Sequence, residues 1–216
     1  MQIFLDSAEL DLIKKYVSWG VVDGVTTNPS LILKSGADLK SRILEICELV
    51  PGPVSCEVVA EDVTGMVEQG RLFSKWADNI FVKIPITSNG LEAVKILSQE
   101  GIHTNVTLIF NAMQALLAAK AGATLVSPFV GRLEDIGQDG ISLVEEIVNI
   151  FGLYNIETKV LSASLRTTKH VLDSARAGAD IVTIPPQLLD QLLVHPLTKS
   201  GLEKFMEDAK KTGVNF

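Results

Sequence analysis

A single lysine lies within a strongly apolar segment of the chain, the run Phe-Val-Lys-Ile-Pro at residues 81–85. Such a run predicts a strand that is buried on both faces, with side chains alternating between them. A buried ammonium is costly, and the neutral amine that it becomes is a nucleophile toward carbonyl carbons. Lys83 therefore indicates Schiff-base chemistry. The alternative is an edge-strand lysine that keeps its ammonium in water to resist aggregation, and this segment alone supports both interpretations equally.

Polar side chains also occur in or at the ends of the other predicted strands. They are Asp6, Thr27, Asn28, Glu57, Asn105, Thr107, Ser127 (with Phe129 two residues on), Ser162 and Ser164. Residues two apart in a strand share a face, so the pairs at 105 and 107, 127 and 129, and 162 and 164 are each expected to point the same way. A convergent set of acids, amides and hydroxyls around a lysine favours the catalytic interpretation over the edge-strand lysine.

Several members of this set have a structural explanation when each is taken singly. Asp6 could cap a helix, Asn28 followed by proline is a good N-cap, and Thr107 suits a strand as a β-branched residue. Glu57 is harder to explain in this way, because a carboxylate inside an apolar strand needs a partner. The cluster thus depends most on Lys83 and Glu57.

Two arginines, Arg132 and Arg166, lie just beyond the sixth and seventh predicted strands. Loop arginines are usually solvated. Two that converge on one site suit bidentate binding of a phosphate, because the planar guanidinium matches its oxygens. We therefore expect a phosphate site formed by the late loops of the fold.

The elements that must position these residues alternate regularly along the chain. Strands are expected at residues 3–5, 24–27, 54–59, 81–85, 104–110, 124–130, 159–164 and 181–184, each followed by a helix. This alternation requires parallel strands with helical crossovers. Eight units in 216 residues fit a single-domain α/β protein, a closed (β/α)8 TIM barrel spanning residues 1–216 with a closing C-terminal helix over 197–211. The C-terminal strand ends of such a barrel carry the active site.

Composition narrows the function classes. The formal charge of −7 without a Lys/Arg block argues against nucleic-acid binding, and no apolar run is long enough for a membrane span. The chain begins directly with a predicted strand, so we expect no leader peptide. Cys47 and Cys56 are expected to be reduced core residues of a cytoplasmic protein. His103, His170 and His195 form no ligand motif, so we expect no metal.

Six motifs, in this order, carry a resemblance to a known family. They are Phe-Leu-Asp at 4–6, Gly-Val-Thr-Thr-Asn-Pro-Ser at 24–30, Val-Lys-Ile-Pro at 82–85, Asn-Val-Thr-Leu-Ile-Phe at 105–110, Ser-Pro-Phe-Val-Gly-Arg at 127–132 and Ala-Ser-Leu-Arg at 163–166. The chain resembles the transaldolases, in particular their short members, over nearly its whole length. The second and fifth motifs are the most specific, and the ordered set is a strong signal.

The resemblance implies a (β/α)8 barrel, class I aldolase chemistry without metal or cofactor, and sugar-phosphate substrates. By motif position, Lys83 would form the Schiff base, and Asp6 would be the acid/base for carbon–carbon cleavage. The water would be held by Glu57 and Thr107, the donor hydroxyls and imine by Asn28, Asn105 and Ser127, and the phosphate by Arg132, Ser164 and Arg166. A dihydroxyacetone unit would pass from a ketose phosphate such as sedoheptulose 7-phosphate to an aldose phosphate such as glyceraldehyde 3-phosphate. The short members also assemble as pentamer-based decamers, which implies a homo-oligomer.

Two alternatives stay open. Relatives within the same family cleave fructose 6-phosphate without transfer, and they typically carry glutamine on strand three and tyrosine on strand six. Glu57 and Phe129 in this chain instead match the transaldolase pair. A barrel that only binds a sugar phosphate would use Arg132 and Arg166 without needing Lys83.

Overall fold

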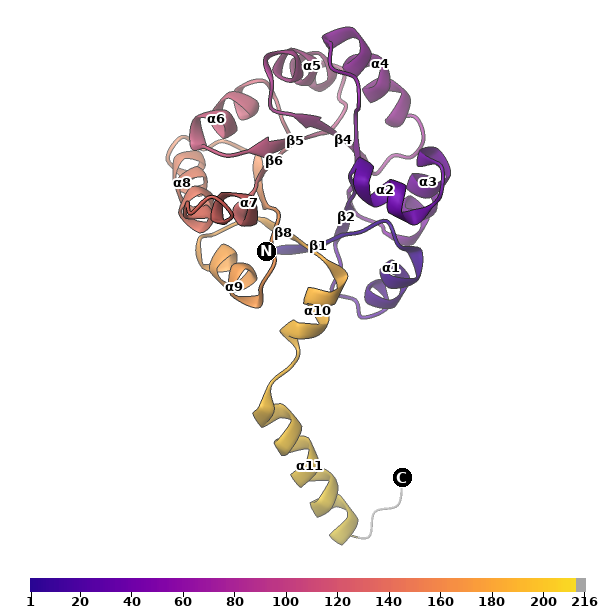
Figure 1. Ribbon diagram of the computed structural model, residues 1–216, viewed down its shortest axis with the longest axis vertical. Helices are drawn as coiled ribbons and strands as arrows, with labels where there is room; N and C mark the ends of the chain where they lie inside the picture. Colours follow the sequence, from indigo (N-terminus) through magenta and orange to yellow (C-terminus); the bar gives the residue numbers. More distant parts are fainter. Residues whose placement is uncertain (213–216) are drawn as a thin grey trace.

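Eight parallel strands form a closed barrel in the computed structural model, which describes residues 1–212. Each strand pairs with the next in the sequence, and β1 pairs with β8 to complete the ring (Figure 1). The strands are β1 (Gln2–Asp6), β2 (Gly24–Thr26), β3 (Val54–Glu57), β4 (Ile80–Pro85), β5 (Thr104–Ile109), β6 (Leu125–Pro128), β7 (Lys159–Ser162) and β8 (Ile181–Ile184). The predicted (β/α)8 barrel is confirmed.

Helices surround the strands on the outside of the ring, apart from the last one, α11 (Pro196–Lys211) (Figure 1). The surrounding helices are α1 (Leu10–Val17), α2 (Pro29–Ser35), α3 (Leu39–Leu49), α4 (Val63–Phe73), α5 (Ser88–Gln99), α6 (Ala112–Lys120), α7 (Val130–Glu134), α8 (Gly140–Leu153), α9 (Thr168–Arg176) and α10 (Pro186–Leu192). The expected alternation of one strand with one helix did not include α2 or α7, because each precedes a longer helix in the same crossover.

Short polar side chains begin most of these helices. Each side-chain oxygen accepts a hydrogen bond from a backbone N–H of the first helical turn, which satisfies a donor that has no partner within the helix. These N-cap residues are Asn28, Asp38, Asp62, Thr87, Asn111, Asp139 and Thr167. The caps fix the point at which the chain leaves each loop, and thereby the loops above the strand ends.

Two apolar layers hold the barrel together. The larger lies between the strands and the surrounding helices. The smaller fills the barrel interior and consists of Phe4, Leu125, Leu161, Ala163 and Ile181, with Phe81 and Phe129 packed against it. Side chains two positions apart in a strand point to the same face. The residues that lie two positions further along each strand than this interior layer therefore also point into the barrel, nearer the C-terminal ends of the strands. That alternation places a ring of polar side chains above an apolar plug.

The last helix, α11, lies where the sequence predicts it but projects away from the barrel (Figure 1). None of its described residues is buried. Its apolar stripe includes Leu202, Phe205 and Met206, whose exposed fractions are 60%, 71% and 56%. The expected closing helix therefore does not pack over the barrel of its own chain, and this stripe has no partner within residues 1–212. None of the helices in this part of the chain has the length and apolar character needed to cross a membrane.

Candidate active site

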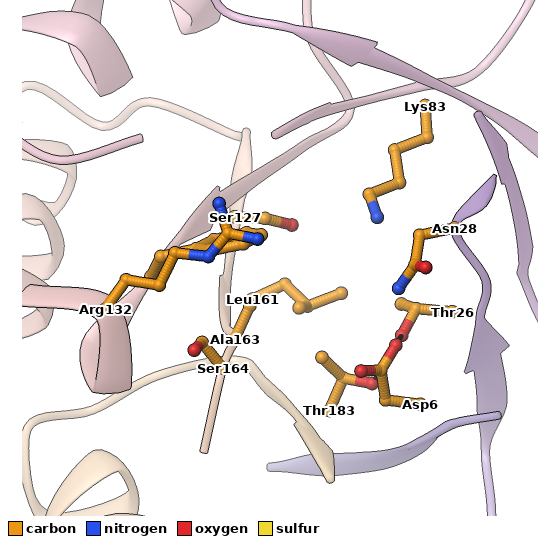
Figure 2. A pocket seen from close by; sticks show the side chains of 11 residues that line it. Asp6, Thr26, Asn28, Lys83, Ser127, Arg132, Leu161, Ala163, Ser164 and Thr183 are labelled. Atoms are coloured by element: carbon orange, nitrogen blue, oxygen red, sulfur yellow. Dashed lines mark hydrogen bonds between the residues drawn. The ribbon is translucent and has the colours of Figure 1, made fainter. Parts of the chain in front are cut away.

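A cavity opens at the C-terminal ends of the strands, among the side chains drawn in Figure 2. Its lining comes from six of the eight strand–loop units: Asp6, Thr26, Asn28, Lys83, Ser127, Phe129, Arg132, Leu161, Ala163, Ser164 and Thr183. A second hollow adjoins it and shares Asn28, Lys83, Phe129 and Arg132, while adding Glu57 and Thr107. The barrel thus brings most of the predicted site residues into one place.

Lys83 reaches from β4 into the cavity, and only 6% of it is exposed. Its Nζ donates to the Thr27 carbonyl oxygen at 3.0 Å and lies 3.0 Å from Glu57 Oε2. Glu57 and Lys83 are direct neighbours in the β3–β4 register, which is why the two side chains meet. Glu57, whose side chain is 16% exposed, therefore has the partner that the sequence required, and the lysine is not an edge-strand residue.

Asp6 ends β1 on the opposite side of the cavity (Figure 2). Burial raises the pKa of this carboxyl, while the charge of Lys83 and a hydrogen bond from Thr26 lower it by less. The Thr26 hydroxyl lies 2.8 Å from Asp6 Oδ1 and 2.6 Å from the Thr183 hydroxyl. A carboxyl with a raised pKa exchanges its proton at a higher pH than an ordinary aspartate, which suits a group that acts as both base and acid.

Thr107 has a buried hydroxyl without a hydrogen-bond partner among the described residues. It lines the adjoining hollow together with Glu57 and Lys83. The next residue, Leu108, has a φ of 63°, and the β5–β6 register is irregular between Val106 and Ile109. An unsatisfied buried hydroxyl is costly, so this one is suited to bind a water or a substrate hydroxyl.

Asn105 is fully buried below the cavity and does not line it. Its amide nitrogen donates to Ser55 Oγ at 3.0 Å, and its oxygen accepts from Ser127 Oγ at 2.6 Å. Ser127 does line the cavity. Asn105 is therefore placed to orient Ser127, which is a less direct position than the resemblance implied.

Asn28 combines both of the interpretations that the sequence allowed. Its Oδ1 caps α2 by accepting from the Leu31 N–H at 3.0 Å. The same side chain lines the cavity beside Lys83 (Figure 2). Because the cap fixes the rotamer through the oxygen, the amide nitrogen is left to meet a ligand.

The pairing expected of Ser162 and Ser164 is wrong. Ser162 Oγ lies 2.9 Å from the Ser174 hydroxyl of α9, outside the barrel, whereas Ser164 lines the cavity. Strand β7 ends at Ser162, and Ser164 has a φ of 60°, so the alternation of faces does not continue between them. Leu161 and Ala163 take the inward positions.

The two arginines differ in where they point. Arg132 lines the cavity and lies over the Phe129 ring, with 5.1 Å from its guanidinium carbon to the ring centroid. Arg166 lines neither hollow. Its guanidinium instead donates to both carboxylate oxygens of Asp135, at 2.5 and 2.7 Å. The structure therefore places Arg132 and Ser164 together at the cavity and holds the side chain of Arg166 beside it.

Four residues of the lining were not anticipated: Thr26, Leu161, Ala163 and Thr183. Thr183 carried a usable signal, because it is a polar residue in the apolar strand Ile-Val-Thr-Ile. Thr26 carried the same signal, two residues before Asn28 in the alternating pattern. Leu161 and Ala163 look like ordinary core residues in the sequence, and only the register of β7 shows that they face the cavity.

The described residues contain no group of three or more His, Cys, Asp or Glu side chains arranged to hold a metal ion. Both cysteines are free; Cys56 is buried and Cys47 is half-buried. Burial raises the pKa of the Cys56 thiol to about 12 and that of Cys47 to about 11. Neither thiol is therefore activated as a nucleophile.

Comparison with known proteins gives a consistent result. A family model described as Transaldolase/Fructose-6-phosphate aldolase matches residues 3–216. A probable transaldolase of Methanococcus maripaludis is 59% identical over 208 residues, covering 96% of this chain and 97% of that protein. A probable transaldolase of Clostridium acetobutylicum is 56% identical over 211 residues, covering 98% of each. Among solved structures, inosine 5′-monophosphate dehydrogenase from Legionella pneumophila matches with a TM-score of 0.60 at 12% identity, covering 87% of this chain and 58% of that one; this likeness concerns the fold alone.

Proposed function

Because the chain belongs to the transaldolase/fructose-6-phosphate aldolase family, we propose that it is a transaldolase, a transferase that moves a dihydroxyacetone unit between sugar phosphates through a lysine Schiff base. The donor and acceptor pair would be sedoheptulose 7-phosphate and glyceraldehyde 3-phosphate, giving erythrose 4-phosphate and fructose 6-phosphate. The two relatives described above are each named a probable transaldolase, and each matches this chain over almost its whole length.

The observation that carries this proposal is the buried Lys83 between two carboxyl groups. Glu57 Oε2 lies 3.0 Å from the amine, and the raised pKa of Asp6 reflects its burial on the other side of the same cavity. An amine must lose a proton before it can attack a ketone, and Glu57 is close enough to accept it. A protein that only bound sugar phosphates would gain nothing from burying this pair, which costs desolvation energy.

The steps follow from the positions of these groups. The Lys83 amine attacks the donor ketone, and the carbinolamine loses water to form a protonated imine. Asp6 then removes the proton from the hydroxyl of the leaving aldehyde carbon, and the carbon–carbon bond breaks as the imine accepts its electrons. The resulting enamine attacks the acceptor aldehyde, and the sequence runs backward to release the new ketose. Each positioned acid or base contributes roughly 10²–10⁴-fold to the rate.

The other polar groups have supporting roles in this scheme. Glu57 and the buried Thr107 hydroxyl hold the water that leaves and returns. Asn28 and Ser127 bind donor hydroxyls, with Asn105 behind Ser127. The phosphate is bound by Arg132, Ser164 and Arg166, and Phe129 forms the apolar wall beside Arg132.

Broader properties are part of the same proposal. We propose that residues 1–216 act as one domain, that the reaction uses no metal or cofactor, and that it belongs to pentose phosphate metabolism in the cytoplasm. We also propose that the protein is a homo-oligomer, a pentamer or decamer, with neither a nucleic acid nor a membrane as partner. The exposed apolar stripe of α11 supports an assembly of this kind, because such stripes are normally covered.

Reductive trapping tests the proposal. Borohydride added with fructose 6-phosphate is expected to leave a reduced three-carbon adduct on Lys83, located by peptide mass spectrometry. Lys83→Arg should keep the fold and lose both adduct and turnover. Lys34, which lines the second hollow, supplies the control. Lys34→Arg should still form the adduct on Lys83, as the wild type does. An adduct on Lys34, or full activity without any adduct, would contradict the assignment.

A further inference from the structure

The ion pair between Arg166 and Asp135 involves the arginine that the proposed phosphate site needs. Both terminal nitrogens of the guanidinium donate to this carboxylate, and about half of each side chain is exposed. The hydrogen bonds from Arg166, together with its charge and that of Arg132, hold the pKa of Asp135 below its usual range. Asp135 is therefore charged at neutral pH and occupies the face of Arg166 that would bind an anion.

The backbone beneath Arg166 is anchored independently of this pair. The Arg166 N–H donates to His170 Nδ1 at 3.2 Å, and His170 Nε2 lies 2.9 Å from Glu134 Oε2. The Gly131 N–H of α7 donates to the Ser164 carbonyl at 3.1 Å. Only the side chain of Arg166 has to move to change partner, and a half-exposed arginine side chain can do so without disturbing the loop.

We propose that Asp135 is a specificity-determining residue that competes with the substrate phosphate for Arg166. This inference rests on the proposed function, in which Arg166 binds phosphate. A phosphate that takes over the guanidinium has to break the bidentate pair and meets the negative charge of Asp135. A substrate without phosphate bears neither cost. Asp135 therefore weakens the binding of phosphorylated substrates and speeds the release of phosphorylated products.

Asp135→Asn tests this on the full-length protein, with inorganic phosphate as the probe in a calorimetric titration. The variant keeps the size of the side chain and removes its charge. We expect the Kd for phosphate to fall about two- to five-fold, the range typical for loss of one exposed ion pair. The KM for fructose 6-phosphate should fall relative to that for unphosphorylated dihydroxyacetone. An unchanged or higher Kd overturns the proposal.

A matched control lies on the outside of the barrel. Arg71 of α4 makes the same kind of pair with Glu100, from its Nε and one terminal nitrogen, at comparable exposure. Glu100→Gln removes an arginine–carboxylate pair of similar exposure far from the cavity. It should leave phosphate binding unchanged. An effect equal to that of Asp135→Asn would mean that net charge alone is responsible, which also overturns the proposal.

A double-mutant comparison identifies Arg166 as the mediator. In an Arg166→Ala background, Asp135→Asn should no longer change the Kd for phosphate, because the guanidinium for which Asp135 and phosphate compete is absent. A persistent effect would mean that Asp135 repels phosphate directly, contrary to the proposal. If Arg166→Ala weakens phosphate binding but Asp135→Asn does not change it, only this inference fails. If neither Arg166→Ala nor Arg132→Ala changes phosphate binding, the phosphate site in the proposed function fails.

Discussion

At the scale of single residues, the balance of forces on Asp6 predicts a pH dependence. As a base Asp6 must be ionised, so kcat/KM should fall as the pH drops through its raised pKa, above the usual range for aspartate. Thr26→Val removes a hydrogen bond that stabilises the ionised form, so this acid limb should move to higher pH. Thr104→Val, which removes a buried hydroxyl without a partner among the described residues, is the control and should not move the limb. If the acid limb of the pH profile stays in place in Thr26→Val, as it does in the control, Asp6 is excluded as the base.

The same carboxyl should reduce stability at neutral pH. A pKa that is raised in the folded state means that the folded protein binds this proton more tightly than the unfolded chain. The Asp6 contribution to the free energy of unfolding is therefore greatest below the unfolded pKa and declines as the pH rises through the folded value. Asp6→Asn cannot ionise, so its Tm should exceed that of the wild type at pH 7 and approach it near pH 4. Each 1 kcal/mol would appear as about 2–4 °C in a chain of this size. A lower Tm at pH 7 would mean that the attraction to Lys83 outweighs burial.

Phe129 bears on the choice between transfer and simple cleavage. Hydrolytic release of dihydroxyacetone needs a proton at the enamine carbon, and a phenylalanine has no hydroxyl to donate or to hold a water there. Phe129→Tyr should therefore raise acceptor-free cleavage of fructose 6-phosphate relative to transfer to erythrose 4-phosphate. Phe110 packs edge-on against Phe129 at 5.9 Å between ring centroids, so Phe110→Tyr is a neighbouring control. A wild type that cleaves equally fast without acceptor would favour the aldolase alternative.

At the scale of elements, the short helix α7 acts as a support for the loop that carries Ser164 and Arg166. A Cβ placed on Gly131 would lie 2.3 Å from the Ser164 carbonyl oxygen and 2.9 Å from Arg166 Nε, so no larger residue fits. Gly131→Ala should push this loop away and raise the KM for phosphorylated substrates several-fold, with a smaller effect on dihydroxyacetone. The measurement is a comparison of the two KM values.

Gly152 provides the matched control for this substitution. It lies in helix α8, and a Cβ added there would have nothing within 4 Å. Gly152→Ala should leave both KM values unchanged and stabilise the protein by about 0.5–1 kcal/mol, because alanine loses less backbone freedom on folding. Equal changes in KM for both variants would show that the effect of Gly131→Ala is general and not specific to the loop.

The sequence predicts the regular alternation of the fold better than its irregular or additional elements. All eight strands could be predicted, because each contains apolar or β-branched residues and is separated from the next strand by a helical pattern. The irregularity at Leu108 could not, because nothing in a leucine signals a positive φ. Helices α2 and α7 were not predicted because each is short and precedes a longer helix, α3 or α8, in a crossover where one helix was expected.

The candidate site was predictable where a polar side chain interrupts an apolar strand, as for Lys83 and Glu57. The orientation of Arg166 was not, because it depends on a carboxylate 31 residues earlier in the chain. Nor could the sequence show that Asn105 is buried behind Ser127. Strand alternation fixes the face of a residue, whereas its depth depends on the stagger of the strands around the barrel.

At the scale of the whole molecule, the detached α11 predicts dependence on assembly. Replacing Leu202 and Phe205 with serine should lower the mass found by sedimentation and lower the Tm, because the exposed stripe could no longer be buried against a second copy. Serine at Glu203 and Lys204, between them on the same helix, is the control and should leave the mass unchanged. A wild type that sediments as a monomer would refute the proposed homo-oligomer.

Barrel closure also has a consequence for biosynthesis. The last register to form joins Gln2 to Ile181, so β1 leaves the ribosome long before its second partner is made. At ~5–20 residues per second, translation of the intervening chain takes roughly 9–36 s. During that interval the nascent sheet has an open edge at each end, and such edges promote aggregation. A chain released from a ribosome that stalls before residue 181 would lack β8, so both edges of its sheet would stay unpaired. A chain released after Ile184 would contain all eight strands and could close the barrel.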